Sequence, residues 1–103
     1  VMRDILEDPE YRGCIYINAA VEFPQPHHPA HQSAKKAKAD GVALLADLAE
    51  RAGATDSIGL AQELDMIMEG ALITHQVSTD CDVWLISRRV AETLLERHLP
   101  ATV

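Results

Sequence analysis

The spacing of apolar and polar positions along the chain predicts helices. From Pro29, apolar and small residues recur every three or four positions as far as about Ala52, and Gly53 then marks a stop. Proline suits the first position of a helix, because the N–H that it lacks would have no partner there. The pattern therefore predicts one long helix over 29–52.

Two further helices follow by the same criteria. Asp56 is a plausible N-cap for a helix over 57–77, since a short acidic side chain can accept from the free N–H groups of a first turn. Thr79, with Asp82 three residues later, gives a weaker, box-like start for a last helix over 80–99. Pro100 ends that pattern.

The N-terminal part is harder to interpret. Residues 1–8 read as the end of a helix that Pro9 closes. The segment 10–23 has strand propensity at Cys14 and the three residues after it, yet its apolar positions keep a helical spacing and no second strand is in sight to pair with it. Helix is the better interpretation. The fold class is therefore all-α, with one domain over 1–103 and about five helices.

The helix over 57–77 has two apolar faces rather than one when it is drawn at 3.6 residues per turn. The main stripe consists of Leu60, Leu64, Ile67, Met68, Ala71 and His75. A second stripe on a different side consists of Met66, Ile73 and Val77. We expect Met68 to pack in the core and Met66 to contact a partner.

The last helix is apolar over about half of its circumference, which is more than packing onto a single neighbour requires. Extra apolar surface on adjacent helices points to a partner surface, although both helices could instead be central in the monomer. We predict that these two helices pair with a second copy as a four-helix bundle. The predicted interface residues are Met66, Ile73, Val77, Val83, Trp84, Val90 and Leu94.

Composition and charge narrow the function. The 103 residues carry a formal net charge of -7, and only 4% are aromatic, which favours a helical core of small aliphatic residues. An acidic surface repels a phosphate backbone, and Lys35, Lys36 and Lys38 are too few to overcome this and read as a solvated face. Direct DNA binding by this chain is not expected.

Cysteine usage and hydropathy predict a reduced, cytoplasmic protein. Cys14 and Cys81 are far apart and lack the spacing of a metal or redox motif. No apolar run has the length needed to span a bilayer, so we expect no membrane contact. The start at Val1-Met2 suggests a fragment or a trimmed product.

Histidines are the candidate chemical groups. His27, His28 and His31 form an H-H-x-x-H pattern that fits either a surface loop or a metal site, and the loop is favoured because no carboxylate motif follows. His75 lies in an apolar stripe and is either a core residue with one hydrogen-bond partner or a polar contact inside a ligand cavity. Asn18 has the same two interpretations. No catalytic triad, carboxylate pair or phosphate loop is present, so neither catalysis nor a cofactor or metal is predicted.

An ordered set of short segments resembles the C-terminal domain of the TetR (tetracycline-repressor-like) family of transcriptional regulators. The most specific piece runs from Arg12-Gly13-Cys14 through Asn18-Ala19-Ala20 to Glu22-Phe23-Pro24 and His28-Pro29. The segments that follow in the expected order are Ala52-Gly53-Ala54, Leu60-Ala61 and Glu69-Gly70-Ala71-Leu72.

The resemblance implies an all-helical domain that binds a small apolar or amphipathic effector and forms a homodimer through its last two helices. It implies that DNA is read by an N-terminal helix-turn-helix domain, which we expect to be absent from this chain. Effector binding would shift the dimer between DNA-binding states. The residues transferred to the effector cavity are Tyr16, Asn18, Met68 and His75. The alternatives are a helical pairing module without a ligand and, less favoured, a small metal enzyme using the three histidines.

Overall fold

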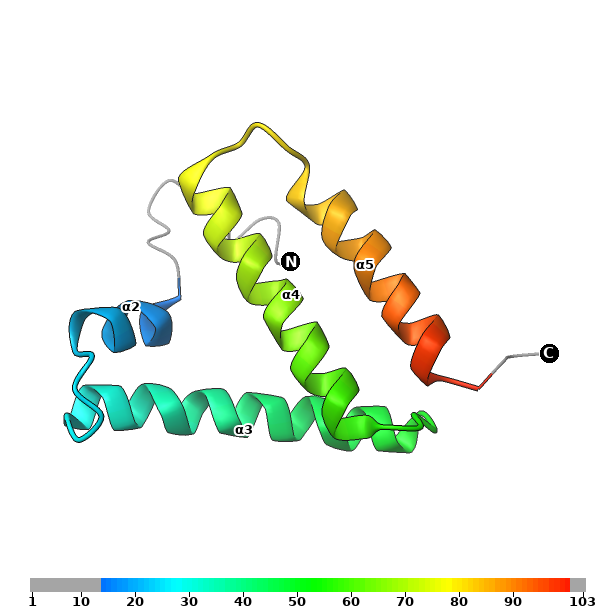
Figure 1. Cartoon of the computed structure of the whole chain (residues 1–103), viewed down its shortest axis with the longest axis horizontal. Coiled ribbons are helices and arrows are strands. Elements are labelled where there is room, and N and C mark those ends of the chain that lie inside the picture. Colours follow the sequence, from blue (N-terminus) through cyan, green and yellow to red (C-terminus); the bar gives the residue numbers. More distant parts are fainter. Residues whose placement is uncertain (1–13, 101–103) are drawn as a thin grey trace. The chain divides into compact units, whose positions relative to one another are not determined.

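Four helices make up the part of the chain that the computed structural model describes, residues 14–100 (Figure 1). They are α2 (Ile15–Glu22), α3 (Pro29–Arg51), α4 (Ser57–Val77) and α5 (Val83–His98). No strand occurs among these residues, which confirms the all-α class. The helix expected at residues 1–8 lies outside the described residues. The chain divides into two compact units, Val1–Gly41 and Val42–Val103, and the boundary falls within α3.

In the first unit, the segment with mixed strand and helix signals is helical, as predicted. Cys14 has extended backbone angles at the N-cap of α2, and its carbonyl accepts the first helical bond from the Asn18 N–H at 3.0 Å. The Phe23 N–H closes the helix on the Ala19 carbonyl at 2.9 Å. Local backbone hydrogen bonds thus satisfy a segment that has no neighbouring strand to pair with.

The turn between α2 and α3 is held by two histidines. The Nδ1 atom of His28 accepts from the Ala30 N–H at 3.0 Å, which satisfies a free donor of the first turn of α3. The His28 ring also stacks on Phe23 with 4.2 Å between ring centroids. His31 donates from its Nδ1 atom to the Phe23 carbonyl at 3.0 Å. Both imidazoles therefore organise the turn.

The corner between α3 and α4 follows the predicted signals. α3 ends at Arg51, and Gly53 takes a φ of 89°, a left-handed value that favours glycine because a side chain would crowd the backbone. Asp56 then caps α4, accepting from the Gly59 N–H at 3.0 Å. Both boundary predictions are confirmed.

The start of α5 differs from the prediction. Thr79 does not begin the helix; the Oδ1 atom of Asp82 accepts from the N–H groups of Trp84 at 3.2 Å and Leu85 at 3.1 Å, and the helix begins at Val83. Thr79 lies in the turn that precedes it. A carboxylate accepts more strongly than a hydroxyl, and Asp82 stands directly before the apolar run.

The core of the second unit is small and lies where α4 and α5 pack side by side (Figure 1). Leu60 and Ala61 are 1% and 0% exposed. The other buried residues of this unit are Ala49, Ala71, Val83 and His98. Among the described helices, none has the length and apolar character needed to cross a membrane.

Candidate interaction surface on α4 and α5

An open groove of about 220 Å³ runs between α4 and α5 within the second unit. Its lining residues are uncharged. They come from one face of α4, from the segment that connects α4 to α5, and from one face of α5. They are Met66, Ile67, Gly70, Ala71, Thr74, Cys81, Val83, Ile86, Ser87 and Val90. We call this surface the α4–α5 groove.

Several large apolar side chains of α4 and α5 are exposed, and two of them, Met66 and Ile86, line the α4–α5 groove. Met66 is 71% exposed, Ile73 is 47% exposed and Val77 is 81% exposed. These three residues are the second stripe that the sequence pattern separated from the core, and their exposure in the single chain confirms that separation. Ile86 of α5, 47% exposed, adds to the same surface.

The remaining predicted interface residues are less accessible. Val83 is only 4% exposed in the single chain, so a partner would cover little additional area there. Trp84, Val90 and Leu94 are half-buried. The role of these residues in a dimer interface stays a prediction.

The four predicted effector residues are divided between the units. Tyr16, 45% exposed, and Asn18, also exposed, belong to α2 in the first unit. Met68 and His75 belong to α4 in the second, and neither lines the α4–α5 groove. An effector cavity shared by these residues stays a prediction.

The surroundings of Met68 and His75 differ from each other. Met68 is 42% exposed, so the expectation that it packs in the core is wrong, since its position lies toward the edge of the inner stripe. The half-buried His75 ring lies 6.4 Å from the Trp84 ring, tilted by 46°. His75 therefore contributes to the contact between α4 and α5.

A polar contact between α4 and α5 that the helical patterns did not predict joins a buried histidine to a partly exposed glutamate. His98, 7% exposed, lies at the end of α5, and its Nε2 atom is 3.3 Å from the Oε1 atom of Glu63 on α4. The two residues are 35 positions apart in the chain. Glu63 and His98 fall on unremarkable positions of their own helices, so only the packing of one helix on the other brings them together.

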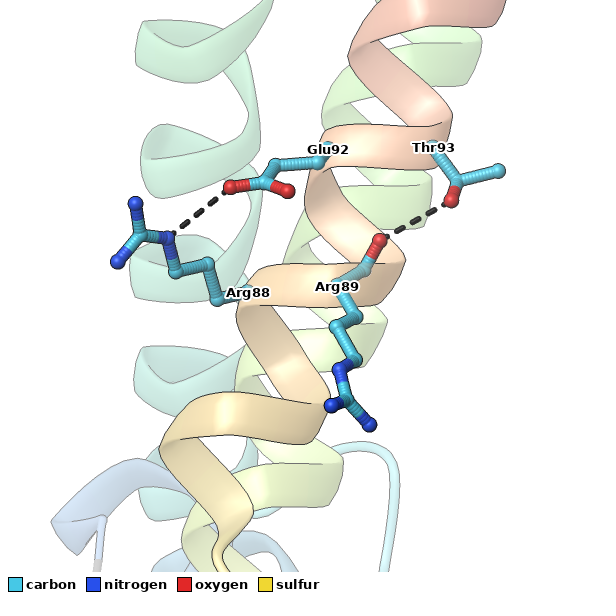
Figure 2. A network of polar contacts seen from close by, with 4 residues as sticks. All are labelled: Arg88, Arg89, Glu92 and Thr93. Atoms are coloured by element: carbon cyan, nitrogen blue, oxygen red, sulfur yellow. Dashed lines mark hydrogen bonds and ion pairs between the residues drawn. The ribbon is translucent and has the colours of Figure 1, made fainter.

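The charged residues of α5 lie away from the groove lining. Figure 2 shows Arg88 and Glu92 on one side of the helix and Arg89 and Thr93 on another. The Nε atom of Arg88 lies 3.0 Å from Oε1 of Glu92, and the Thr93 hydroxyl donates to the Arg89 carbonyl at 3.0 Å. Exposed pairs of this kind add little stability.

The histidine pattern does not form a metal site in the part of the chain that is described. There, no group of three potential ligands is arranged to hold a metal ion. The Nδ1 atoms of His28 and His31 are already used by backbone groups of the α2–α3 turn. That arrangement accounts for two of the three histidines as parts of the fold.

Comparison with known proteins agrees with the observed fold. The family model described as "Tetracyclin repressor-like, C-terminal domain" matches residues 1–89. The HTH-type transcriptional regulators YjdC of Escherichia coli (strain K12) and Shigella flexneri are each 26% identical over 97 residues, which cover 91% of this chain and 49% of each relative.

A solved structure gives the same result. SCO4454, a TetR-family transcriptional regulator from Streptomyces coelicolor, superposes with a TM-score of 0.77 at 26% identity, over 91% of this chain and 46% of that one. The chain thus spans about half the length of the relatives that it matches. These relatives are transcriptional regulators. The chain belongs to the family of tetracycline-repressor-like C-terminal domains.

Proposed function

We propose that this chain is the effector-sensing and dimerisation domain of a TetR-type transcriptional regulator, and that it pairs with a second copy through α4 and α5. The observation that carries the pairing is the exposure of four large apolar side chains, namely Met66 and Ile86 in the lining of the α4–α5 groove and Ile73 and Val77 on the same side of α4 as Met66 by helical spacing. Soluble domains rarely expose contiguous apolar surface without a partner. A second copy would remove it from water.

The pairing has a direct energetic argument. Burying apolar surface contributes roughly 25 cal/mol for each Å² removed from water. The core of the second unit is built largely from small residues, and Leu60 is its one large side chain that is almost fully buried. A domain with so small a core gains stability when a partner covers its remaining apolar face.

The sensing part of the proposal is supported by family membership. A small apolar or amphipathic effector would bind better to one arrangement of the dimer than to the other and shift the population toward it. DNA would be bound through an N-terminal domain of the regulator, in the cytoplasm, and not by this acidic segment. Tyr16, Asn18, Met68 and His75 are the residues we assign to effector contact.

Sedimentation of the purified chain tests the pairing. We expect a dimer at micromolar concentration, because the lining of the α4–α5 groove is uncharged and large apolar side chains of both helices are exposed. A single species with the mass of one chain, unchanged up to the highest concentration measured, would refute the proposed dimer.

A further inference from the structure

The ring of His28 caps the first turn of α3, and this contact exists only while the ring is neutral. Pro29, the first residue of α3, has no N–H, so Ala30 carries the first free donor of the helix. The Ala30 N–H donates to the Nδ1 atom of His28 at 3.0 Å. A ring nitrogen accepts a hydrogen bond only when it carries no proton. The Nδ1 atom is therefore both the cap and the atom at which the ring would take up its second proton.

His31, near the same turn, makes the opposite kind of contact. Its Nδ1 atom lies 3.0 Å from the Phe23 carbonyl, which can only accept, so the His31 ring donates there. Both the neutral and the cationic form of an imidazole can supply a proton to such a bond. Of the two histidines that organise the turn, His28 is the one whose hydrogen bond requires an unprotonated nitrogen.

Protonation of His28 changes three interactions. The new Nδ1–H would face the Ala30 N–H, which places two donors against each other. The cationic ring would also stand at the N-terminus of α3, where the helix dipole disfavours positive charge. The stack on Phe23, with 4.2 Å between ring centroids, acts in the opposite direction because an aromatic face attracts a cation. That attraction is weak for a ring that is only half-buried, whereas the capping bond is lost entirely.

The charged and titratable groups of the surrounding elements do not reverse this balance. The His28 ring contacts an amide N–H and a phenyl ring, neither of which carries a charge. The side chains of Glu22 at the end of α2, His27 in the turn and Lys35 in α3 are exposed, so water screens their charges. A protonated His31 would add a second cation near the turn, which repels a charged His28.

We propose that His28 is a proton-controlled cap, in which uptake of a proton at Nδ1 breaks the bond to Ala30 and opens the turn between α2 and α3. Imidazoles ordinarily change charge between about pH 5 and about pH 8, so acidification within that range operates the device. The turn joins α3 to α2, the helix that carries Tyr16 and Asn18. Acidification therefore loosens the attachment of α2. The proposal is independent of pairing through α4 and α5.

Solvent exchange of the Ala30 amide tests the proposal, measured by NMR on the whole isotope-labelled chain and corrected for the intrinsic pH dependence of exchange. We expect the protection of this amide to fall about fivefold between about pH 7.5 and about pH 5, the loss that corresponds to one net hydrogen bond. The Gly59 amide is the internal control, because it donates to the Asp56 carboxylate at 3.0 Å in the first turn of α4. Carboxylates ordinarily titrate near pH 4, so the protection of Gly59 should stay constant.

Two variants keep the test specific. His28→Asn supplies a capping oxygen that does not titrate, so the protection of Ala30 should become independent of pH. His27→Asn is the matched control, since His27 is the exposed neighbour of His28, and it should keep the wild-type response. Circular dichroism at neutral pH checks that both variants retain their helices.

Three results would overturn the proposal. The first is an Ala30 amide whose protection in the wild-type chain is the same at both pH values, which needs no variant. The second is an equal loss at Gly59, which indicates general acid unfolding instead of a local cap. The third is a pH response that persists in His28→Asn.

Discussion

His98 connects the end of α5 to α4 and to the corner between α3 and α4. Its ring nitrogen contacts the Glu63 carboxylate, and its carbonyl accepts from the Thr55 N–H at 2.9 Å. The Nδ1 atom of His98 and the Oε2 atom of Glu63 are buried without a hydrogen-bond partner among the described residues. Removing one residue of this pair leaves a buried atom of the other without a partner, and the cost is reduced because the Glu63 side chain is 38% exposed.

We expect His98→Ala to lower the free energy of unfolding by about 2 kcal/mol, since it removes a buried ring and leaves Glu63 without its partner. Chemical denaturation measures this change. A double-mutant cycle with Glu63→Ala should give a coupling of about 1 kcal/mol, reduced because Glu63 is partly exposed. The exposed His27→Ala is the control; equal effects of the two histidine substitutions would contradict a fastening role.

At the scale of the helices, α4 carries two apolar stripes with different exposure. The main stripe, with Leu60 and Ala71, packs in the second unit and is the inner stripe. The second stripe, with Met66, Ile73 and Val77, remains exposed and is the outer stripe. A helix that only packed on its own domain would need one stripe. We therefore expect substitutions in the outer stripe to affect the proposed pairing and to leave the fold of the single chain unchanged.

Ile73→Glu should convert the dimer to a monomer while leaving the helical content unchanged, since a charge would have to be buried in the interface but meets water in the single chain. Sedimentation measures the oligomeric state, and circular dichroism measures the helical content. Ile58→Glu is the matched control, because Ile58 is an exposed isoleucine in the first turn of α4, 61% accessible, and lies outside the stripe of Met66, Ile73 and Val77. A dimer that tolerates Ile73→Glu as well as Ile58→Glu would rule out the interface.

At the scale of the whole molecule, two conclusions have different support. Membership of the tetracycline-repressor-like C-terminal family rests on a family match over residues 1–89 and on a solved relative with the same fold. Pairing and effector binding are proposals that the exposed face and the family support. The alternative to effector binding is a helical pairing module that binds no ligand.

Thermal shift against a set of small apolar and amphipathic compounds separates these possibilities. We expect at least one compound to raise the melting temperature, because a ligand that binds only the folded state stabilises it by mass action. A hit should lose its effect in Tyr16→Ala or His75→Ala if those residues contact it. If the chain is a dimer and no compound raises its melting temperature, the pairing module without a ligand is favoured.

The sequence alone determined the all-α class, the ends of α3 and α4, and the outer stripe of α4. Those features depend on local signals, namely proline and glycine positions, a capping carboxylate and a helical spacing, which act within a few residues. The cap of α5 was misplaced by three residues because Thr79 and Asp82 both offer capping chemistry, and only the fold selected Asp82.

Tertiary structure decided the features that join distant residues. The pair of Glu63 and His98, the burial of Val83 and the α4–α5 groove all arise where α4 packs on α5. No periodicity within one helix reports which turn of it lies opposite which turn of another. That register comes from side-chain packing between helices, and it placed both the core and the groove.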